Sequence, residues 1–294
     1  MSKKVSSNIN WYPGHMFKTK RQLEEISSKI DVAVEILDSR IPRSSRNYDL
    51  VSMLDKKKSV KRIIVLNKAD LADDRETDRW MQEFKNKFKE HELEVEIFKI
   101  DANSGKGIKE LKDAIAKNKK GISTVRTLIF GIPNVGKSTI INKLAGKKTM
   151  QTENKPGVTK KLQWLRIDEN ISALDSPGML WPNFEKREVG INLALVDAIR
   201  NDRVDNIEIA CELMENIFKK EEYKEAFFKR YDLKDEDFEK GKNTVNAYYY
   251  LLSVMAERKN MLISGGNPDY NRIANAVLKD FRTNKIEKIT LERV

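Results

Sequence analysis

Gly131-Ile132-Pro133-Asn134-Val135-Gly136-Lys137-Ser138 is the stretch that decides the fold of this 294-residue chain. It follows an apolar run at 127–130 and precedes a helical pattern at 137–145. The spacing GxxxxGK[ST] is typical of a phosphate-binding loop, where backbone N–H groups face the phosphates and the lysine lies near the β- and γ-oxygens. The hydroxyl of Ser138 is predicted to ligate Mg²⁺. The predicted nucleotide contacts of this loop are Asn134, Val135, Gly136, Lys137, Ser138 and Thr139.

A base-reading motif, Asn67-Lys68-Ala69-Asp70, stands upstream of that loop. The carboxylate of Asp70 can accept hydrogen bonds from the ring N–H and the exocyclic amine of guanine, and adenine offers neither. Asn67 can meet the opposite edge of the base and tie loops together, and the stem of Lys68 can lie over the base plane. Together with the phosphate loop, the motif predicts GTP as the ligand.

Three further segments complete the predicted site. In Asp175-Ser176-Pro177-Gly178, Asp175 is expected to hold Mg²⁺ through water, and the N–H of Gly178 to meet the γ-phosphate. Thr159 lies where a threonine should ligate Mg²⁺ and sense the γ-phosphate, although it could be an ordinary loop residue. In Asp101-Ala102-Asn103, we expect Ala102 and Asn103 to contact the base, with the Ala102 N–H reaching the guanine carbonyl, although an aspartate replaces the usual serine.

The order of these motifs is rotated, because conventional small GTPases place the NKxD motif last. Apolar runs alternate with helical patterns before residue 181, which predicts a mostly parallel sheet with helices on both faces. After Trp181 almost everything has a helical pattern, including a core-facing stripe at 270–281 and a similar one at 243–258. We therefore predict an α/β, circularly permuted P-loop GTPase domain at 1–180 and an all-α domain at 181–294. Strands are expected at 32–37, 63–66, 95–100 and 127–130, a paired ribbon at 162–167 and 171–174, and helices at 16–29, 73–90, 107–117 and 137–145.

Composition limits the partners and the cellular compartment to be expected for this protein. The net charge is +11, and residues 1–180 carry 36 Lys and Arg against 24 Asp and Glu, a balance of +12. Such a basic half can steer a protein toward RNA, although a solvated lysine-rich surface is the plainer explanation. A single cysteine, Cys211, fits a reducing cytosol, and no apolar run is long enough for a transmembrane helix. The N-terminus lacks the apolar segment of a secretory signal, so a cytoplasmic protein is expected.

The residue after the DxxG motif is Met179, where many GTPases carry a glutamine that orients the attacking water. A thioether cannot do this. His15, in Trp11-Tyr-Pro-Gly-His15-Met16, is a candidate because a neutral imidazole can accept a hydrogen bond from water. The alternative is a structural histidine that caps a helix starting near Met16.

The motif order NKAD, GIPNVGKS, PGVT, DSPG resembles the circularly permuted GTPases of bacterial ribosome assembly. The opening WYPGHM, the segment at 37–42 and the ending DYNRIANAVLKDFRTNKIEKITLE are most similar to the ribosome biogenesis GTPase A family. The resemblance implies that His15 is the catalyst, that Met179 is the hydrophobic replacement, and that Asn134 can hold K⁺. It also implies binding to large-subunit rRNA in a late intermediate, docking through the helical domain, and release after hydrolysis. Ser39, where alanine is more usual, and Asp101 depart from the family pattern.

Several functions stay open at this point. The first is a GTPase that times a step of large-subunit assembly, stimulated by ribosomal particles and acting as a monomer with no membrane partner. The second is a GTP-gated RNA-binding scaffold with negligible turnover. A permuted GTPase in an organelle or on another RNA ranks lower, and an ATPase ranks lowest because Asp70 would have no partner on adenine.

Overall fold

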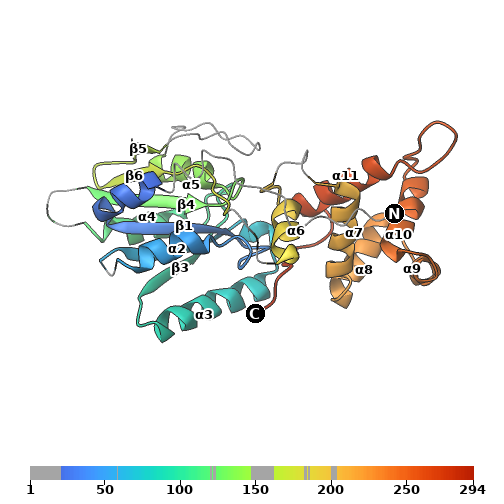
Figure 1. Ribbon diagram of the computed structural model, residues 1–294, viewed down its shortest axis with the longest axis horizontal. Helices are drawn as coiled ribbons and strands as arrows, with labels where there is room; N and C mark the ends of the chain where they lie inside the picture. The colour runs from blue at the N-terminus through green and yellow to red at the C-terminus, as the bar shows by residue number, and fades with distance from the viewer. Residues whose placement is uncertain are drawn as a thin grey trace.

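The central strands are almost wholly apolar, and this composition fixes their place. Every residue of β1 (Val32–Asp38) is buried, as is every residue of β4 (Val125–Gly131) except Arg126. Strands buried on both faces need helices on both faces, which is the usual setting of parallel sheets. In the computed structural model these strands lie in the middle of a six-stranded sheet (Figure 1). The structure describes residues 21–57, 59–119, 121, 124–146, 162–181, 184, 186–199 and 204–294.

The sheet has the order β3-β2-β1-β4-β6-β5, and only the pairing of β5 with β6 is antiparallel. β2 and β3 are therefore added on one side of β1, and β6 and β5 on the far side of β4. Ligands of such sheets bind at the carboxyl ends of the strands, at the point where the strand order reverses. The other strands are β2 (Lys61–Asn67), β3 (Val95–Lys99), β5 (Gln163–Arg166) and β6 (Ile171–Asp175). The expected mostly parallel sheet and the expected ribbon are both present.

Helices cover both faces of the sheet. One hydrophobic cluster joins α4 (Ile108–Ala116) and α5 (Lys137–Ala145) to one face. On the other face, two clusters hold α2 (Tyr48–Asp55), α3 (Asp74–Glu90) and the helical residues 21–26. Short 3₁₀ turns are η1 (Ser27–Lys29) and η2 (Ala69–Leu71). α2 is not among the helices expected from the sequence, and the described part of the helix expected at 16–29 ends as a 3₁₀ turn. We call residues 21–181 the sheet lobe.

The helical lobe, α6 to α11, lies beside the carboxyl ends of the strands, with α6 nearest the sheet (Figure 1). Its stripe on α11 is buried as expected. Val245, which we expected on the stripe at 243–258, is fully exposed because Asn246 caps the helix and the first turn begins only at Ala247. The lobe consists of α6 (Arg187–Leu195), α7 (Asn206–Ile217), α8 (Glu221–Tyr231), α9 (Asp235–Lys242), α10 (Ala247–Arg258) and α11 (Tyr270–Arg282). The division of the chain at residue 180 stays a prediction.

The helical pattern expected after Trp181 does not extend to residues 285–294, which we call the C-terminal strap. Its alternating apolar residues Ile289 and Leu291 are buried, and the backbone N–H of Leu291 donates to the carbonyl of Arg40 at 2.8 Å. The strap thus returns from the helical lobe to the loops of the sheet lobe. Within the described ranges, no helix is both long and apolar enough to cross a membrane.

Candidate nucleotide-binding site

The phosphate loop joins the end of β4 to the start of α5. Gly136 there has a φ of +100°, and a Cβ at this position would lie 2.3 Å from Nδ2 of Asn67. Only glycine avoids both the left-handed strain and the clash. The loop therefore brings the N-terminus of α5, with its outward backbone N–H groups, to the carboxyl edge of the sheet, where such groups bind anions.

Lys137 is held inside this loop. Its Nζ donates to the carbonyl of Ile132 at 2.7 Å and to that of Gly131 at 3.2 Å. Burial lowers the pKa of Lys137 to about 8, although the nearby carboxylate of Asp175 opposes the change. Ser138 and Thr139 follow it on the first turn of α5, half-buried. The ammonium thus lies where an incoming phosphate would replace its backbone partners.

Asn67 ties three loops together. Its Nδ2 donates to the carbonyl of Val135 at 2.7 Å, and its Oδ1 accepts from the backbone N–H of Ala102 at 3.2 Å. Asn103 lies beside it, and the carboxylate of Asp101 accepts from the N–H of Asn103 at 2.9 Å. Aspartate therefore fits this loop, in place of the usual serine, because it caps the turn. Since the Ala102 N–H is engaged by Asn67, its use for the guanine carbonyl stays a prediction.

The side chain of Asp70 has a buried acceptor atom, Oδ1, without a donor among the described residues. Burial raises the pKa of Asp70, and the neighbouring charge of Asp101 raises it further. A buried acceptor without a partner costs free energy, so a ligand that supplies N–H donors would be favoured there.

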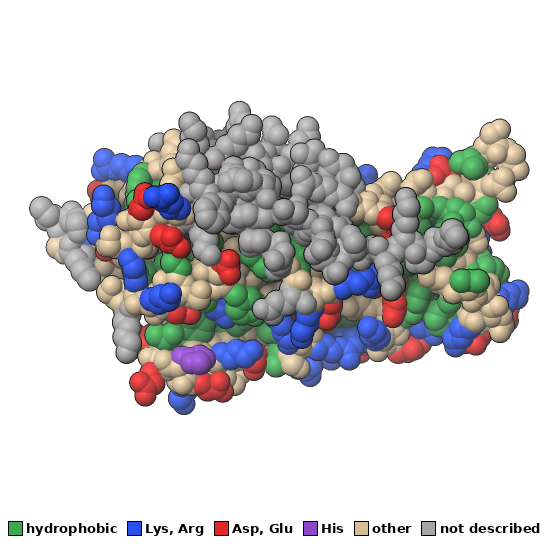
Figure 2. Space-filling view, viewed as in Figure 1, with side chains coloured by type: hydrophobic (Ala, Val, Ile, Leu, Met, Phe, Trp, Pro, Cys, Tyr) green, Lys and Arg blue, Asp and Glu red, His purple; other side chains and the backbone are tan. Residues whose placement is uncertain are grey.

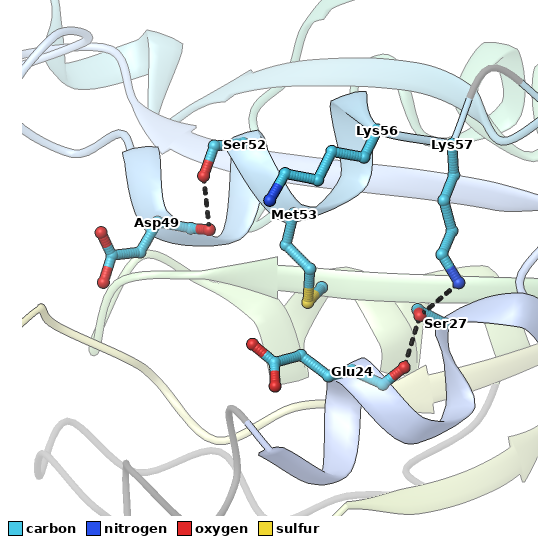
Figure 3. Close-up of a pocket in the computed structure, with 7 residues that line it drawn as sticks. All are labelled: Glu24, Ser27, Asp49, Ser52, Met53, Lys56 and Lys57. Carbon is cyan, nitrogen blue, oxygen red and sulfur yellow. Dashed lines mark hydrogen bonds between the residues drawn. The ribbon is translucent and has the colours of Figure 1, made fainter.

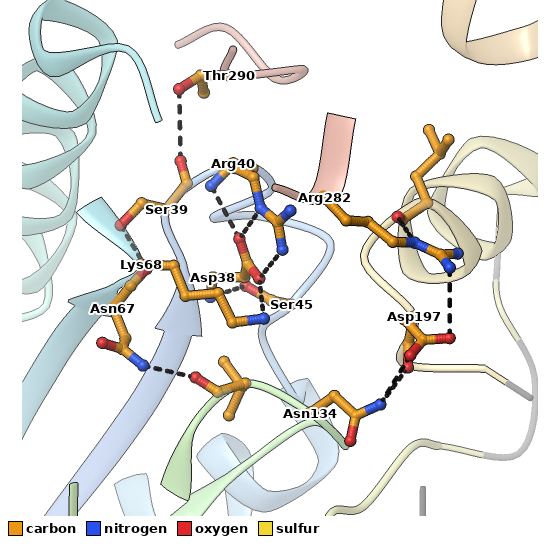
Figure 4. Close-up of polar contacts among 12 residues, drawn as sticks. Asp38, Ser39, Arg40, Ser45, Asn67, Lys68, Asn134, Asp197, Arg282 and Thr290 are labelled. Carbon is orange, nitrogen blue, oxygen red and sulfur yellow. Dashed lines mark hydrogen bonds and ion pairs between the residues drawn. The ribbon is translucent and has the colours of Figure 1, made fainter. Parts of the chain in front are cut away.

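A buried ion cluster supports the base-reading loop (Figure 4). The guanidinium of Arg40 binds Asp38 with contacts of 2.8 and 2.7 Å, and the ammonium of Lys68 lies 3.1 Å from the same carboxylate. Burial alone would raise the pKa of Asp38, but Arg40 and Lys68 hold it well below its usual range. Lys68 itself adopts a left-handed conformation with a φ of 59°. We had not predicted Arg40 as a residue of this site, although it stands in the quoted segment 37–42.

The DxxG segment packs against the phosphate loop. Asp175 is fully buried at the end of β6, opposite Ile129 of β4. At Gly178 a Cβ would lie 2.6 Å from the Cα of Pro133, so the close approach requires glycine. Met179 is buried in the hydrophobic cluster that includes α2, and its N–H donates to the carbonyl of Gly131 at 3.3 Å. The predicted residues His15 and Thr159 lie outside the described residues.

These loops surround a cavity of about 270 Å³. Asp70, Ala102 and Asn103 of the base-reading loops line it, together with Asn134, Gly136 and Thr139 of the phosphate loop and α5. The helical lobe also contributes, through Val196, Asp197, Arg282 and Thr283. These four residues come from the loop after α6 and the end of α11, where no local sequence motif marks them as part of a nucleotide site.

A second cavity, of about 340 Å³, lies between residues 24–27 and α2 (Figure 3). Lys56 and Lys57, from the lysine cluster of the basic half, line it together with Glu24 and Asp49. The ammonium of Lys57 donates to Oγ of Ser27 at 2.7 Å. Because carboxylates share this hollow, it is not a purely cationic surface.

Comparisons with known proteins agree with this geometry. The family described as elongation factor Tu GTP binding domain matches residues 3–120, and the family described as 50S ribosome-binding GTPase matches residues 126–242. The boundary between the matches falls between the base-reading and phosphate loops, as the rotated motif order requires.

Full-length relatives are also similar. Ribosome biogenesis GTPase A of Bacillus cereus is 38% identical over 97% of this chain and 93% of its own length. The protein of the same name from Priestia megaterium is 37% identical, with 97% and 96% covered. The GDP-bound structure of YlqF from Thermotoga maritima has a TM-score of 0.59 at 25% identity and covers 93% of this chain and 99% of that one. The predicted fold class is thereby confirmed.

Proposed function

This chain belongs to the ribosome biogenesis GTPase A family, and from that premise we propose that it is a GTP-hydrolysing assembly factor. It binds the maturing large ribosomal subunit through rRNA, is stimulated by that particle, and leaves after hydrolysis. We place it in the cytoplasm, as a monomer. The observation that carries the nucleotide choice is the buried Oδ1 of Asp70, which has no donor among the described residues and which guanine would supply.

The residues of the phosphate end fit Mg²⁺. The family uses this ion, which prefers hard oxygen ligands. The Ser138 hydroxyl opens α5, and the buried carboxylate of Asp175 ends the neighbouring β6. We assign Ser138 and Thr159 as its ligands, with Asp175 acting through water. When bound, Mg²⁺ would neutralise charge on the phosphates. The amide of Asn134, on the same loop, is the proposed ligand for K⁺.

For hydrolysis, we assign the orientation of the attacking water to His15. Met179 cannot take this role, because its side chain is apolar and lies in a hydrophobic cluster, only 3% exposed. His15→Ala should abolish particle-stimulated hydrolysis while GTP binding stays intact. His91→Ala is the matched control, because the only other histidine lies exposed at the end of α3. Normal stimulated turnover by His15→Ala would remove His15 from the mechanism.

The connection between the lobes supports a nucleotide-dependent docking. β6 leads through Asp175-Ser176-Pro177-Gly178 toward α6, so a switch that tightens on the γ-phosphate is covalently tied to the helical lobe. GTP should therefore favour one docking pose and GDP another. Sedimentation of the protein with large-subunit precursors, with a non-hydrolysable GTP analogue or with GDP, tests this. Equal binding in both states would count against it.

The proposed contact with rRNA depends on positive charge spread over the surface. Lys and Arg gather along the lower edge of the molecule, near the junction of the two lobes (Figure 2). Ion pairs also join the sheet lobe to the helical lobe and the strap, namely Asp73 with Lys220 and Asp74 with Lys288, and they neutralise part of the positive charge. If the remaining positive charge binds rRNA, affinity should fall steeply with salt. A flat salt response would indicate docking through the helical lobe without phosphate contacts.

The buried apolar Met179 also favours a second candidate, the GTP-gated scaffold with negligible turnover. Phosphate release measured with and without large-subunit particles separates the two. The assembly GTPase is expected to accelerate on the particle, whereas the scaffold would bind it in a GTP-dependent way and show no acceleration.

A further inference from the structure

The cavity lined by the base-reading loop is also lined by the phosphate loop and by the helical lobe. By their motifs, Asp70 is assigned to the base end of the site and Gly136 to the phosphate end, and both line this cavity. In a nucleotide the ribose joins base to phosphate, so it must lie between these ends. Asp197 and Arg282 are the charged residues that the helical lobe contributes to the lining.

Asp197 lies just after α6 and has a φ of 63°. This left-handed region is adopted by aspartate and asparagine more readily than by other non-glycine residues. In this conformation its carbonyl accepts from Nδ2 of Asn134 at 2.7 Å, and its Oδ2 lies 3.3 Å from the same nitrogen. Asn134, in the phosphate loop, is left-handed as well, with a φ of 57°. Two contacts therefore join the phosphate loop to the loop after α6, across the two lobes.

Arg282 fixes the position of Asp197. Its guanidinium donates to the carbonyl of Leu195 at 2.8 Å and to that of Ala194 at 2.7 Å, which are the last residues of α6. Its Nη1 lies 3.6 Å from Oδ1 of Asp197. The arginine thus caps the negative end of α6 and sets the carboxylate at the wall of the cavity (Figure 4). Burial raises the pKa of Asp197, and Arg282 opposes this change.

An acid at this place suits a hydroxyl better than a phosphate. A carboxylate repels phosphate oxygens but accepts hydrogen bonds from ribose hydroxyls, as acidic residues do in dinucleotide-binding folds. We propose that Asp197 recognises the ribose of the bound guanine nucleotide by accepting a hydrogen bond from its 2′- or 3′-hydroxyl, with Arg282 as the positioning residue. The inference rests on the proposed function only in that the cavity takes a guanine nucleotide. It gives the helical lobe a direct contact with that nucleotide.

The test is calorimetric titration of the full-length protein with GDP and with 2′,3′-dideoxy-GDP. The natural protein should bind GDP about tenfold tighter, the usual effect of losing a hydrogen bond to a charged group. Asp197→Ala should weaken GDP about tenfold and leave the dideoxy nucleotide nearly unchanged, so that the preference disappears. Arg282→Lys should reduce the preference partly. Asp232→Ala is the matched control, because Asp232 is another left-handed aspartate at a helix end, with a φ of 56°, but it is exposed and does not line this cavity.

Three results would overturn the inference. The natural protein could bind both nucleotides equally, which refutes ribose recognition while leaving GTP binding intact. Asp197→Ala could weaken both nucleotides equally, which would make Asp197 a purely structural partner of Asn134. If the natural protein bound no guanine nucleotide, the proposed function would fall with it. Should Asp197→Ala not fold, Asp197→Asn keeps the size of the side chain and should still reduce the preference, since an amide oxygen is a weaker acceptor.

Discussion

Asp38 is the last residue of β1, Asp70 lies in the loop after the neighbouring β2, and the surroundings of the two carboxylates give them opposite roles. Asp38 binds Arg40 in two places and lies 3.1 Å from Lys68, so its pKa is lowered and it remains an anion that holds two cations. Asp70 has a raised pKa and a buried oxygen without a donor among the described residues. The first carboxylate is satisfied by the protein, whereas the second is completed by a ligand.

Asp70→Asn should reverse the base preference. Guanine offers two N–H donors to the carboxylate, and an amide presents its own donors instead. GDP affinity should therefore fall about 100-fold or more. Xanthosine diphosphate should gain affinity, because it carries a carbonyl where guanine has an amine. Titration of both nucleotides measures this. Asp101→Asn is the control, since Asp101 lines the same cavity but accepts from its own loop, and it should keep the preference for GDP.

Gly136→Ala should disrupt the phosphate loop. The added Cβ would lie 2.3 Å from Nδ2 of Asn67 at a φ of +100°, so Asn67 must release Val135 or the loop must move. Gly146→Ala is the matched control, because Gly146 has a φ of +65° but nothing within 4 Å of the added atom. The control should cost only about 1–2 kcal/mol of left-handed strain and bind GDP normally. Denaturant unfolding and GDP titration compare the two, and equal GDP binding by both variants would contradict the clash.

At the scale of elements, α3 connects the two lobes through its N-cap residue, Asp73. Asp73 caps α3 by accepting from the N–H groups of Arg75 and Glu76. Its other oxygen accepts from the ammonium of Lys220 at 2.8 Å and from the hydroxyl of Tyr223 at 2.9 Å, which belong to the start of α8. Although burial alone would raise it, these partners lower the pKa of Asp73 to about 2.

Asp73→Asn isolates the charge in this connection, because asparagine caps a helix as well as aspartate does. A folded-state pKa below the ordinary value means that the carboxylate stabilises the fold at neutral pH and loses this effect as pH falls toward about 2. The variant should therefore be less stable by about 1–2 kcal/mol at pH 7, with the difference shrinking below about pH 4. Urea unfolding across this range measures it. Asp205→Asn, which changes the cap of α7 within the helical lobe, should cost less.

The elements that could be predicted are those with local patterns. The strands that end at Asp38, Asn67 and Gly131 are mostly apolar. The motifs lie at or just after the ends of two of them, so the edge of the sheet and most of its site residues could be predicted from the sequence. α2 is short and was missed. Asp197 and Arg282 could not be found, because only the packing of α6 against α11 brings them to the cavity. The same holds for the strap, whose partners in the sheet lobe lie more than 200 residues away in the chain.

At the scale of the whole molecule, Glu292 in the strap holds loops of both lobes. Its buried carboxylate accepts from the backbone N–H of Arg43 at 2.6 Å and of Ser44 at 2.9 Å in the sheet lobe. It also accepts from the hydroxyl of Ser44 and, at 3.2 Å, from Nδ2 of Asn192 on α6. The backbone carbonyl of the same residue accepts from Trp80 of α3 at 3.0 Å. One side chain thus joins the loop after β1 to α6, and its backbone joins α3.

Glu292→Ala should therefore lower the free energy of unfolding of the whole protein and not only loosen the strap. The change leaves several buried donors without an acceptor, which costs about 2–4 kcal/mol in the free energy of unfolding. Because Leu291 and Glu292 bind beside Arg40 and α3, the variant should also lose GDP affinity, although neither residue lines the nucleotide cavity. Arg293→Ala is the matched control, since Arg293 is exposed and offers only its backbone carbonyl to Arg43. Denaturant unfolding and GDP titration are the measurements. If Glu292→Ala and Arg293→Ala have the same stability and GDP affinity, the Glu292 carboxylate contributes nothing to either. If Glu292→Ala alone is destabilised and binds GDP less tightly, the strap supports the guanine-reading loop.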